Sequence, residues 1–179
     1  ESLDPLLDVW LPKDRDQKLG FKAASKLMLQ RLAGADIFMH FVDVNAVNND
    51  TSDTSFSPVE SSEIVLHEVS LRLHKLATAC RACCVPQKWV GSSVAIGFDD
   101  GQSNTRSTEG EELLRKSVIV NIFDWGKSEL NTLEHHVSLS ADEQADRLKF
   151  WRFYLQGIDR LAWEASRMYW CRFCNHEGW

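Results

Sequence analysis

The chain lacks any uninterrupted apolar run long enough to cross a bilayer. No such run in its 179 residues approaches the roughly 18 residues that a membrane helix needs. It also lacks an excess of positive charge, because 20 Lys and Arg stand against 26 Asp and Glu, for a formal net charge of −6. An acidic chain is a poor general binder of nucleic acid, and any anionic ligand needs a local basic patch. We therefore expect a soluble protein with no membrane span and no nucleic-acid partner.

Cysteine is scarce and odd in number, with five residues in the chain. This favours reduced thiols in an intracellular compartment, cytoplasmic or nuclear. Cys80 with Cys83, and Cys171 with Cys174, form two C-x-x-C pairs, and two such pairs can make a tetrahedral zinc site. The pairs are far apart in sequence and lie near predicted helix ends, so buried reduced thiols are the commoner interpretation and zinc is the alternative.

The remaining composition is that of one globular domain spanning residues 1–179. The chain is 44% hydrophobic and contains seven Trp, which predicts a real core with large buried anchors. Hydrophobic patterning predicts helices over 21–32, 60–84 and 141–173, the last as one helix or as two with a break near Gly157. It also predicts strands over 37–47, 89–98 and 117–123, and the last of these is expected to be buried. Ser140 and Glu143 predict a capping box, and residues 102–110 and 131–141 are interpreted as polar connections.

A short run near the start combines an acid, an amine and a glycine. Pro12, Asp16, Lys18 and Gly20 form the pattern PxxxDxKxG. On an extended segment, side chains two residues apart point the same way, and a glycine lets the backbone turn or approach a ligand closely. A carboxylate that orients or deprotonates a hydroxyl, beside an ammonium that holds phosphate, suits phosphoryl transfer.

Two more lysines extend this basic region. Lys22 and Lys26 are four residues apart, so they share one face of the helix predicted over 21–32. A solvated lysine face is the commoner interpretation of such spacing. Beside the PxxxDxKxG motif, these two lysines are the most economical phosphate-binding patch in the chain and are our candidates for substrate binding.

Three later stretches complete a pattern in a fixed order. Ser92-Ser93-Val94-Ala95-Ile96 precedes an acidic turn at 99–101, Asp124 ends the strand predicted over 117–123, and residues 154–161 read Tyr-x-x-Gly-Ile-x-x-Leu. Together with PxxxDxKxG, these stretches resemble the inositol polyphosphate kinase family, with its SSLL strand, its IDF strand end and its C-terminal Tyr-x-x-Gly-Leu-x-x-Leu helix.

The resemblance implies an α+β fold, with an antiparallel-rich sheet flanked by helices, and a set of site residues. Asp16 would orient or deprotonate an inositol hydroxyl, and Lys18 would contact phosphate. Asp124 would bind the Mg²⁺ that bridges the phosphates of ATP, with Ser92 and Ser93 supporting the cofactor site. The structural alternatives are a surface ion pair for the first two residues, a turn role for Asp124 and polar strand positions for the serines.

The chain also departs from the family pattern. Charged residues occupy 13–15, where the family continues an apolar strand, and Lys127 lies in the run where the family has a His. Only eleven residues precede Pro12, too few for the family's N-terminal ATP lobe, so the resemblance covers the C-terminal lobe alone. Two hypotheses follow: an ATP-dependent kinase acting on an inositol phosphate, or a catalytically inactive kinase-like subunit that serves as a scaffold with other protein chains.

Overall fold

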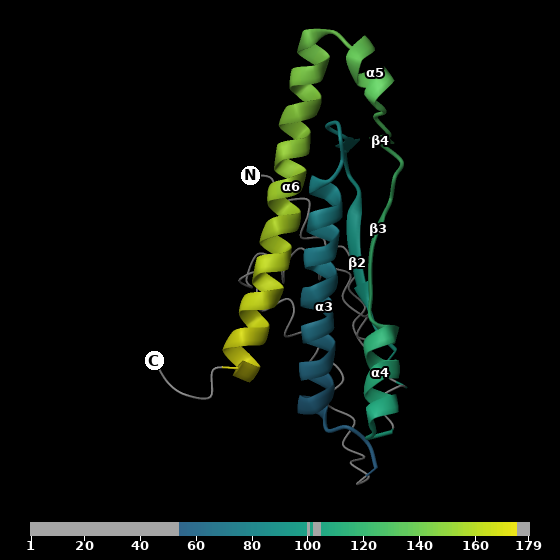
Figure 1. The fold of residues 1–179 in the computed structure, drawn as a ribbon, viewed down its shortest axis with the longest axis vertical. Helices are drawn as coiled ribbons and strands as arrows, with labels where there is room; N and C mark the ends of the chain where they lie inside the picture. The colour runs from purple at the N-terminus through teal and green to yellow at the C-terminus, as the bar shows by residue number, and fades with distance from the viewer. Residues whose placement is uncertain (1–53, 100, 102–104, 175–179) are drawn as a thin grey trace, which may run out of the picture.

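The computed structural model describes residues 54–99, 101 and 105–174 (Figure 1). In chain order, its elements are α3 (Pro58–Arg81), β1 (Lys88–Trp89), β2 (Ser93–Gly97), α4 (Thr108–Ser117), β3 (Ile119–Phe123), β4 (Ser128–Glu129), α5 (Leu133–Ser138), α6 (Ala141–Tyr169) and the π-helical turn η3 (Trp170–Cys174). The α+β class is confirmed, with helices predominating and with antiparallel strand pairs. The elements predicted over 21–32 and 37–47, and the candidates Asp16, Lys18, Lys22 and Lys26, lie outside the described residues.

Two long helices, α3 and α6, form the centre of the described fold. They run antiparallel and lie side by side, with α3 between α6 and the β2–β3 pair in Figure 1. Ser70 Oγ lies 2.8 Å from Ser166 Oγ, while Arg81, at the end of α3, pairs with Asp159, earlier along α6. This hydrogen bond and this ion pair fix the register of α3 against α6.

The core lies mainly between these helices. Val69 and Leu73 of α3 and Ala165 of α6 are fully buried. Further buried apolar side chains from both helices complete the contact, and they are Ile64, Val65, Leu66, Ala77, Trp151, Ile158, Leu161 and Ala162. Burying one large aliphatic side chain stabilises a fold by about 1.5–3 kcal/mol. The paired apolar faces are therefore the main source of stability in this part of the chain.

Both long helices begin with the sequence signals expected of helix starts. Ser57 caps α3 reciprocally with Glu60, and Pro58 occupies the first turn, where a missing N–H costs nothing. The predicted capping box of Ser140 with Glu143 is confirmed at the start of α6. The helix predicted over 141–173 is continuous to Tyr169, so the alternative break at Gly157 is absent from it.

The strands form two separate antiparallel pairs. β2 pairs with β3, with Ser93 opposite Phe123 and Gly97 opposite Ile119, while β1 pairs with β4. The prediction of one strand over 89–98 was wrong, because the chain turns between β1 and β2, where Gly91 takes a φ of 77°. Only glycine adopts such a left-handed φ without steric cost.

Three further predictions are corrected by the structure. The strand predicted over 117–123 is present as β3 but is not buried, since Ile119 is 53% exposed and Phe123 is 44% exposed. The polar connection predicted over 102–110 overlaps the start of α4, and the one predicted over 131–141 contains α5. In α4, the Ser107 hydroxyl accepts a hydrogen bond from the Gly110 N–H, so the polar residues there cap a helix rather than forming an open loop.

Candidate functional site

The pairing of β2 with β3 brings the candidate serines and Asp124 to the same end of the two strands. Ser93 is the first residue of β2, and its partner Phe123 is the last residue of β3. Ser92 immediately precedes the one, and Asp124 immediately follows the other. Segments about thirty residues apart in the sequence therefore meet at this end of the strand pair.

Asp124 occupies an unusual backbone conformation, with a φ of 62°. Asp is one of the few non-glycine residues that adopt this left-handed region readily. Its side chain is exposed and takes part in no hydrogen bond or ion pair with the other described residues. A turn follows, closed by a hydrogen bond of 2.9 Å from the Ser128 N–H to the Trp125 carbonyl. The carboxylate is therefore accessible, and the backbone that carries it is constrained by the strand pairing and by the turn.

Ser92 and Ser93 differ in their surroundings. Ser92 is 4% exposed, and its hydroxyl donates to the Trp89 carbonyl at 3.2 Å, so it stabilises the turn between β1 and β2. It also lies beside the buried Tyr154: burial raises the pKa of that phenol to about 12, and the Ser92 hydroxyl partly opposes the shift. Ser93 is half-buried and is the serine better placed to face a ligand.

An aromatic cluster supports the turn that carries Asp124. The Trp89 ring packs edge-on against three neighbours, with centroid distances of 5.2 Å to Trp125, 5.0 Å to Trp151 and 5.3 Å to Tyr154. Edge-to-face pairs of this kind contribute about 0.5–1.5 kcal/mol each beyond the area they bury. Through this cluster, the residue after Asp124 is held to β1 and to α6.

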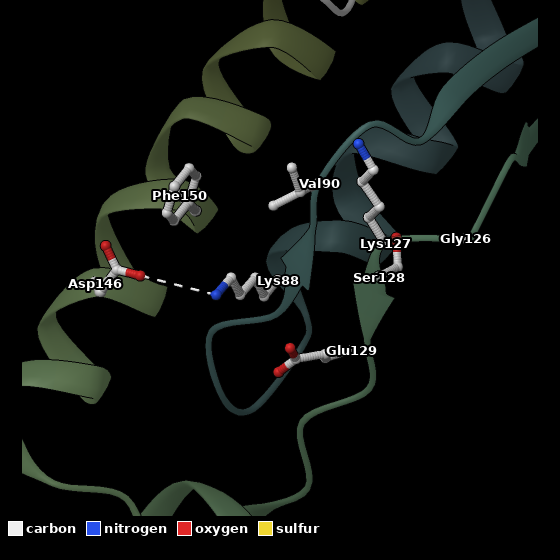
Figure 2. A pocket seen from close by; sticks show the side chains of 8 residues that line it. All are labelled: Lys88, Val90, Gly126, Lys127, Ser128, Glu129, Asp146 and Phe150. Atoms are coloured by element: carbon white, nitrogen blue, oxygen red, sulfur yellow. Dashed lines mark ion pairs between the residues drawn. The ribbon is translucent and has the colours of Figure 1, made fainter.

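A pocket of about 660 Å³ lies beside the turn that follows Asp124 (Figure 2). Gly126, two residues after Asp124, is the first residue of this turn that lines the pocket. Its lining residues come from β1, from the turn and β4, and from α6, and they are Lys88, Val90, Gly126, Lys127, Ser128, Glu129, Asp146 and Phe150. Sequence reasoning did not select Lys88 or Lys127 as binding residues. The turn-forming Gly126-Lys127, shortly after the end of β3, was the sequence feature that could have indicated Lys127. No sequence feature indicates Lys88, because only the pairing of β1 with β4 brings it to the pocket.

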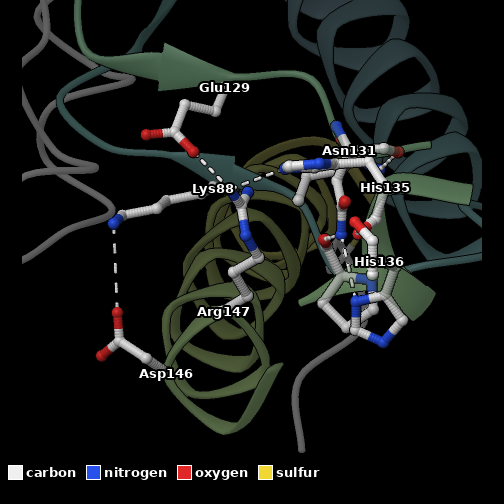
Figure 3. A network of polar contacts seen from close by, with 10 residues as sticks. Lys88, Glu129, Asn131, His135, His136, Asp146 and Arg147 are labelled. Atoms are coloured by element: carbon white, nitrogen blue, oxygen red, sulfur yellow. Dashed lines mark hydrogen bonds and ion pairs between the residues drawn. The ribbon is translucent and has the colours of Figure 1, made fainter. Parts of the chain in front are cut away.

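A buried arginine adjoins this pocket (Figure 3). Arg147 of α6 is 6% exposed and pairs with Glu129 of β4, which is 55% exposed at its side chain. The Arg147 Nη2 atom also lies 3.5 Å from His135 Nε2, while its Nη1 atom has no hydrogen-bond partner among the described residues. The pair connects α6 to β4 at the pocket's edge and neutralises the Glu129 carboxylate that lines the pocket.

The two C-x-x-C pairs lie far apart. Cys80 and Cys83 are at the end of α3 beside Asp159, whereas Cys171 and Cys174 follow the far end of the antiparallel α6. Within the described ranges, no three His, Cys, Asp or Glu side chains gather closely enough to hold a metal ion. The four cysteines of the zinc alternative are thus not brought together. Burial raises the pKa of the Cys80 thiol to about 11, as expected of an unreactive buried thiol.

No family model, curated protein or solved structure matches this chain. Among the residues that the structure describes, no helix has the length and apolar character needed to cross a membrane. Function is therefore inferred from the geometry of the strand end, the turn and the pocket.

Proposed function

We propose that this chain is the C-terminal lobe of an inositol polyphosphate kinase-like protein and that it takes part in ATP-dependent phosphorylation of an inositol phosphate. The observation that supports this most is the pairing of Ser93 with Phe123. It gives the SSLL-like and IDF-like strands the antiparallel adjacency that a shared site needs, and it leaves Asp124 at the end of β3.

The donor chemistry of Asp124 suits Mg²⁺. Mg²⁺ prefers oxygen ligands and is usually held by one or two carboxylates together with substrate phosphates. Asp124 presents one exposed carboxylate that forms no ion pair with another described residue. When bound there, Mg²⁺ would offset the charge of the ATP phosphates during transfer.

The other roles in this proposal belong to the motif near the start of the chain. Asp16 would orient the inositol hydroxyl or accept its proton, and Lys18 would hold the phosphoryl group. Lys22 and Lys26 would bind phosphates already on the substrate. Ser93 would contribute a hydroxyl beside Asp124, whereas the hydroxyl of Ser92 is engaged by the Trp89 carbonyl.

A turnover assay tests this function. The protein is given Mg²⁺-ATP with a panel of inositol phosphates, and phosphorylated products are separated and quantified. Asp124→Asn is expected to lose at least about a hundredfold in turnover, because it removes the metal ligand. Asp142→Asn, which makes the same charge change at the exposed start of α6, is the control and is expected to keep activity. Absence of turnover by the full-length wild-type protein with every substrate in the panel contradicts the kinase function.

A specific surface feature favours the second function, a catalytically inactive scaffold subunit. Leu130, Leu133 and Val137, on and beside α5, are 77%, 63% and 70% exposed. Leu133 and Val137 are four residues apart and share one side of the helix. Clustered exposed apolar side chains are typical of surfaces that dock another chain. Cross-linking of the protein in its native assembly tests this, since partner cross-links are expected to concentrate at α5.

A further inference from the structure

The charges around the pocket are unevenly neutralised. Glu129 pairs with the buried Arg147, and Asp146 lies 4.0 Å from the Lys88 ammonium. Lys127 forms no ion pair with any other described residue, and in Figure 2 it lies on the opposite side of the pocket from Asp146. The pocket lining thus holds two lysines and two carboxylates, and because Arg147 behind the wall neutralises Glu129, the charge of Lys127 is left without a described partner.

A hydroxyl at the pocket wall lacks a partner. Ser128 lines the pocket, and its Oγ atom is buried with no hydrogen-bond partner in the described structure. Buried polar atoms are nearly always paired, so this hydroxyl has unused hydrogen-bonding capacity next to the pocket. A serine hydroxyl donates readily to a phosphate oxygen.

The opposite wall of the pocket is apolar. Phe150 of α6 and Val90 line it, and the Lys88 ammonium lies 5.8 Å from the centre of the Phe150 ring. A pocket with one apolar wall and a few polar groups is typical of small-molecule sites, and a volume of about 660 Å³ lies within their usual range.

We propose that this pocket binds a phosphorylated small molecule, with its phosphates beside Lys127 and Lys88 and its ring against Phe150. The proposal goes beyond the kinase function, because it requires neither Asp124 nor turnover. Lys88 would exchange its long contact with Asp146 for the ligand phosphate, and Lys127 would supply a charge that no described acid neutralises.

The test uses pyrophosphate as the probe, without Mg²⁺, and follows the amide signals of the isotope-labelled full chain by NMR. Saturable shifts are expected at Gly126, Lys127 and Ser128, with a Kd of about 1 mM or tighter. Lys127→Glu is expected to weaken binding at least about tenfold. Lys149→Glu makes the same charge change on α6 outside the pocket lining, and it is expected to change Kd by less than about twofold.

Two further variants probe the opposite walls. Asp146→Asn releases Lys88 and removes a repelling carboxylate, so it is expected to tighten pyrophosphate binding about threefold or more. ADP, which adds a ring to the same phosphates, is expected to bind more tightly than pyrophosphate. Phe150→Ala is expected to abolish that advantage while leaving pyrophosphate binding largely intact.

The proposal is overturned by the absence of saturable shifts at millimolar pyrophosphate, or by equal weakening in Lys127→Glu and Lys149→Glu. The Asp124→Asn variant distinguishes failure of the pocket proposal from failure of the kinase function. That variant is expected to bind pyrophosphate at least as tightly as the wild type, because it removes a nearby negative charge, even though it cannot support turnover. Pyrophosphate binding by a protein without kinase activity would support the pocket and contradict the kinase function.

Discussion

Ser93 and Phe123 are paired across β2 and β3, and this pairing places Asp124 beside the start of β2. The two strands arrive from opposite directions, so the residues that flank this pair leave the sheet at the same end. Phe123 is 44% exposed, so burial of the strand does not fix the position of Asp124. Its position depends on the strand pairing and on the Trp125 ring, which packs on Trp89.

The left-handed backbone of Asp124 predicts different effects for two substitutions. Asp124→Asn is expected to leave the free energy of unfolding close to that of the wild type, because Asn also tolerates a φ near 62°. Asp124→Ala is expected to cost about 1 kcal/mol, since Ala adopts the left-handed region less readily than Asp or Asn. Urea unfolding of both variants measures this difference. Equal stability of the two would contradict a left-handed Asp124.

The Arg147–Glu129 pair predicts an unequal cost for removing each partner. Glu129→Gln is expected to destabilise by about 1–3 kcal/mol, because it leaves a 6% exposed guanidinium without its counter-charge. Arg147→Met is expected to cost less, since Met fills the same space and the half-exposed Glu129 can be solvated by water. Thermal and urea unfolding compare the two variants. A larger loss for Arg147→Met would mean that packing, not charge pairing, is the main contribution of Arg147.

The interface of α3 with α6 predicts a position-specific loss of stability. Leu73→Ala removes a fully buried side chain at this interface and is expected to cost about 2–5 kcal/mol. Leu71→Ala, two residues earlier and 41% exposed, is the matched control and is expected to cost less than about 1 kcal/mol. Denaturant unfolding reports both values. Similar losses at the two positions would contradict the assignment of the buried face of α3.

The capping box at the start of α3 predicts a pH dependence of stability. Hydrogen bonds from the Ser57 backbone and hydroxyl hold the pKa of Glu60 below its ordinary value of 4.5, and Arg106 adds to this. Ionised Glu60 therefore contributes its full stabilisation above about pH 4.5, its ordinary pKa. This contribution is lost as the pH falls through the lower pKa that Glu60 has in the folded protein. Glu60→Gln is expected to flatten the fall in melting temperature between about pH 5 and about pH 3.

A neighbouring glutamate provides the comparison. Glu63→Gln changes an exposed residue one turn further along α3, outside the capping box. Its melting temperature is expected to fall with pH as steeply as that of the wild type. If both variants flatten the profile equally, the capping box is not the cause.

Sequence patterning predicted the long helices well and the connections poorly. Apolar spacing and the Ser140–Glu143 box are local signals, and local signals determine helix starts. The helix α4 was missed because its apolar contribution to the core is concentrated in Leu114, too little to give a periodic pattern. The exposure of β3 could not be predicted, since it depends on which elements cover the sheet.

The candidate site was predictable only in part. The order of the motifs indicated Ser92, Ser93 and Asp124, and β-pairing brings these three residues to one end of the strands. The sequence carries no signal that the Ser92 hydroxyl is occupied by the Trp89 carbonyl. Lys88 and Lys127 were not predicted as binding residues, because only the pairing of β1 with β4 and the packing of α6 bring them to one pocket.

Paramagnetic broadening by Mn²⁺, used in place of Mg²⁺ together with ATP, tests the central claim that Asp124 is the metal ligand of this strand end. On the isotope-labelled protein, the account predicts that amide signals of Ser93, Asp124 and Trp125 broaden first, and that Asp124→Asn abolishes this effect. Broadening that survives in Asp124→Asn, or that is centred on another part of the chain such as the end of α6, would contradict the account.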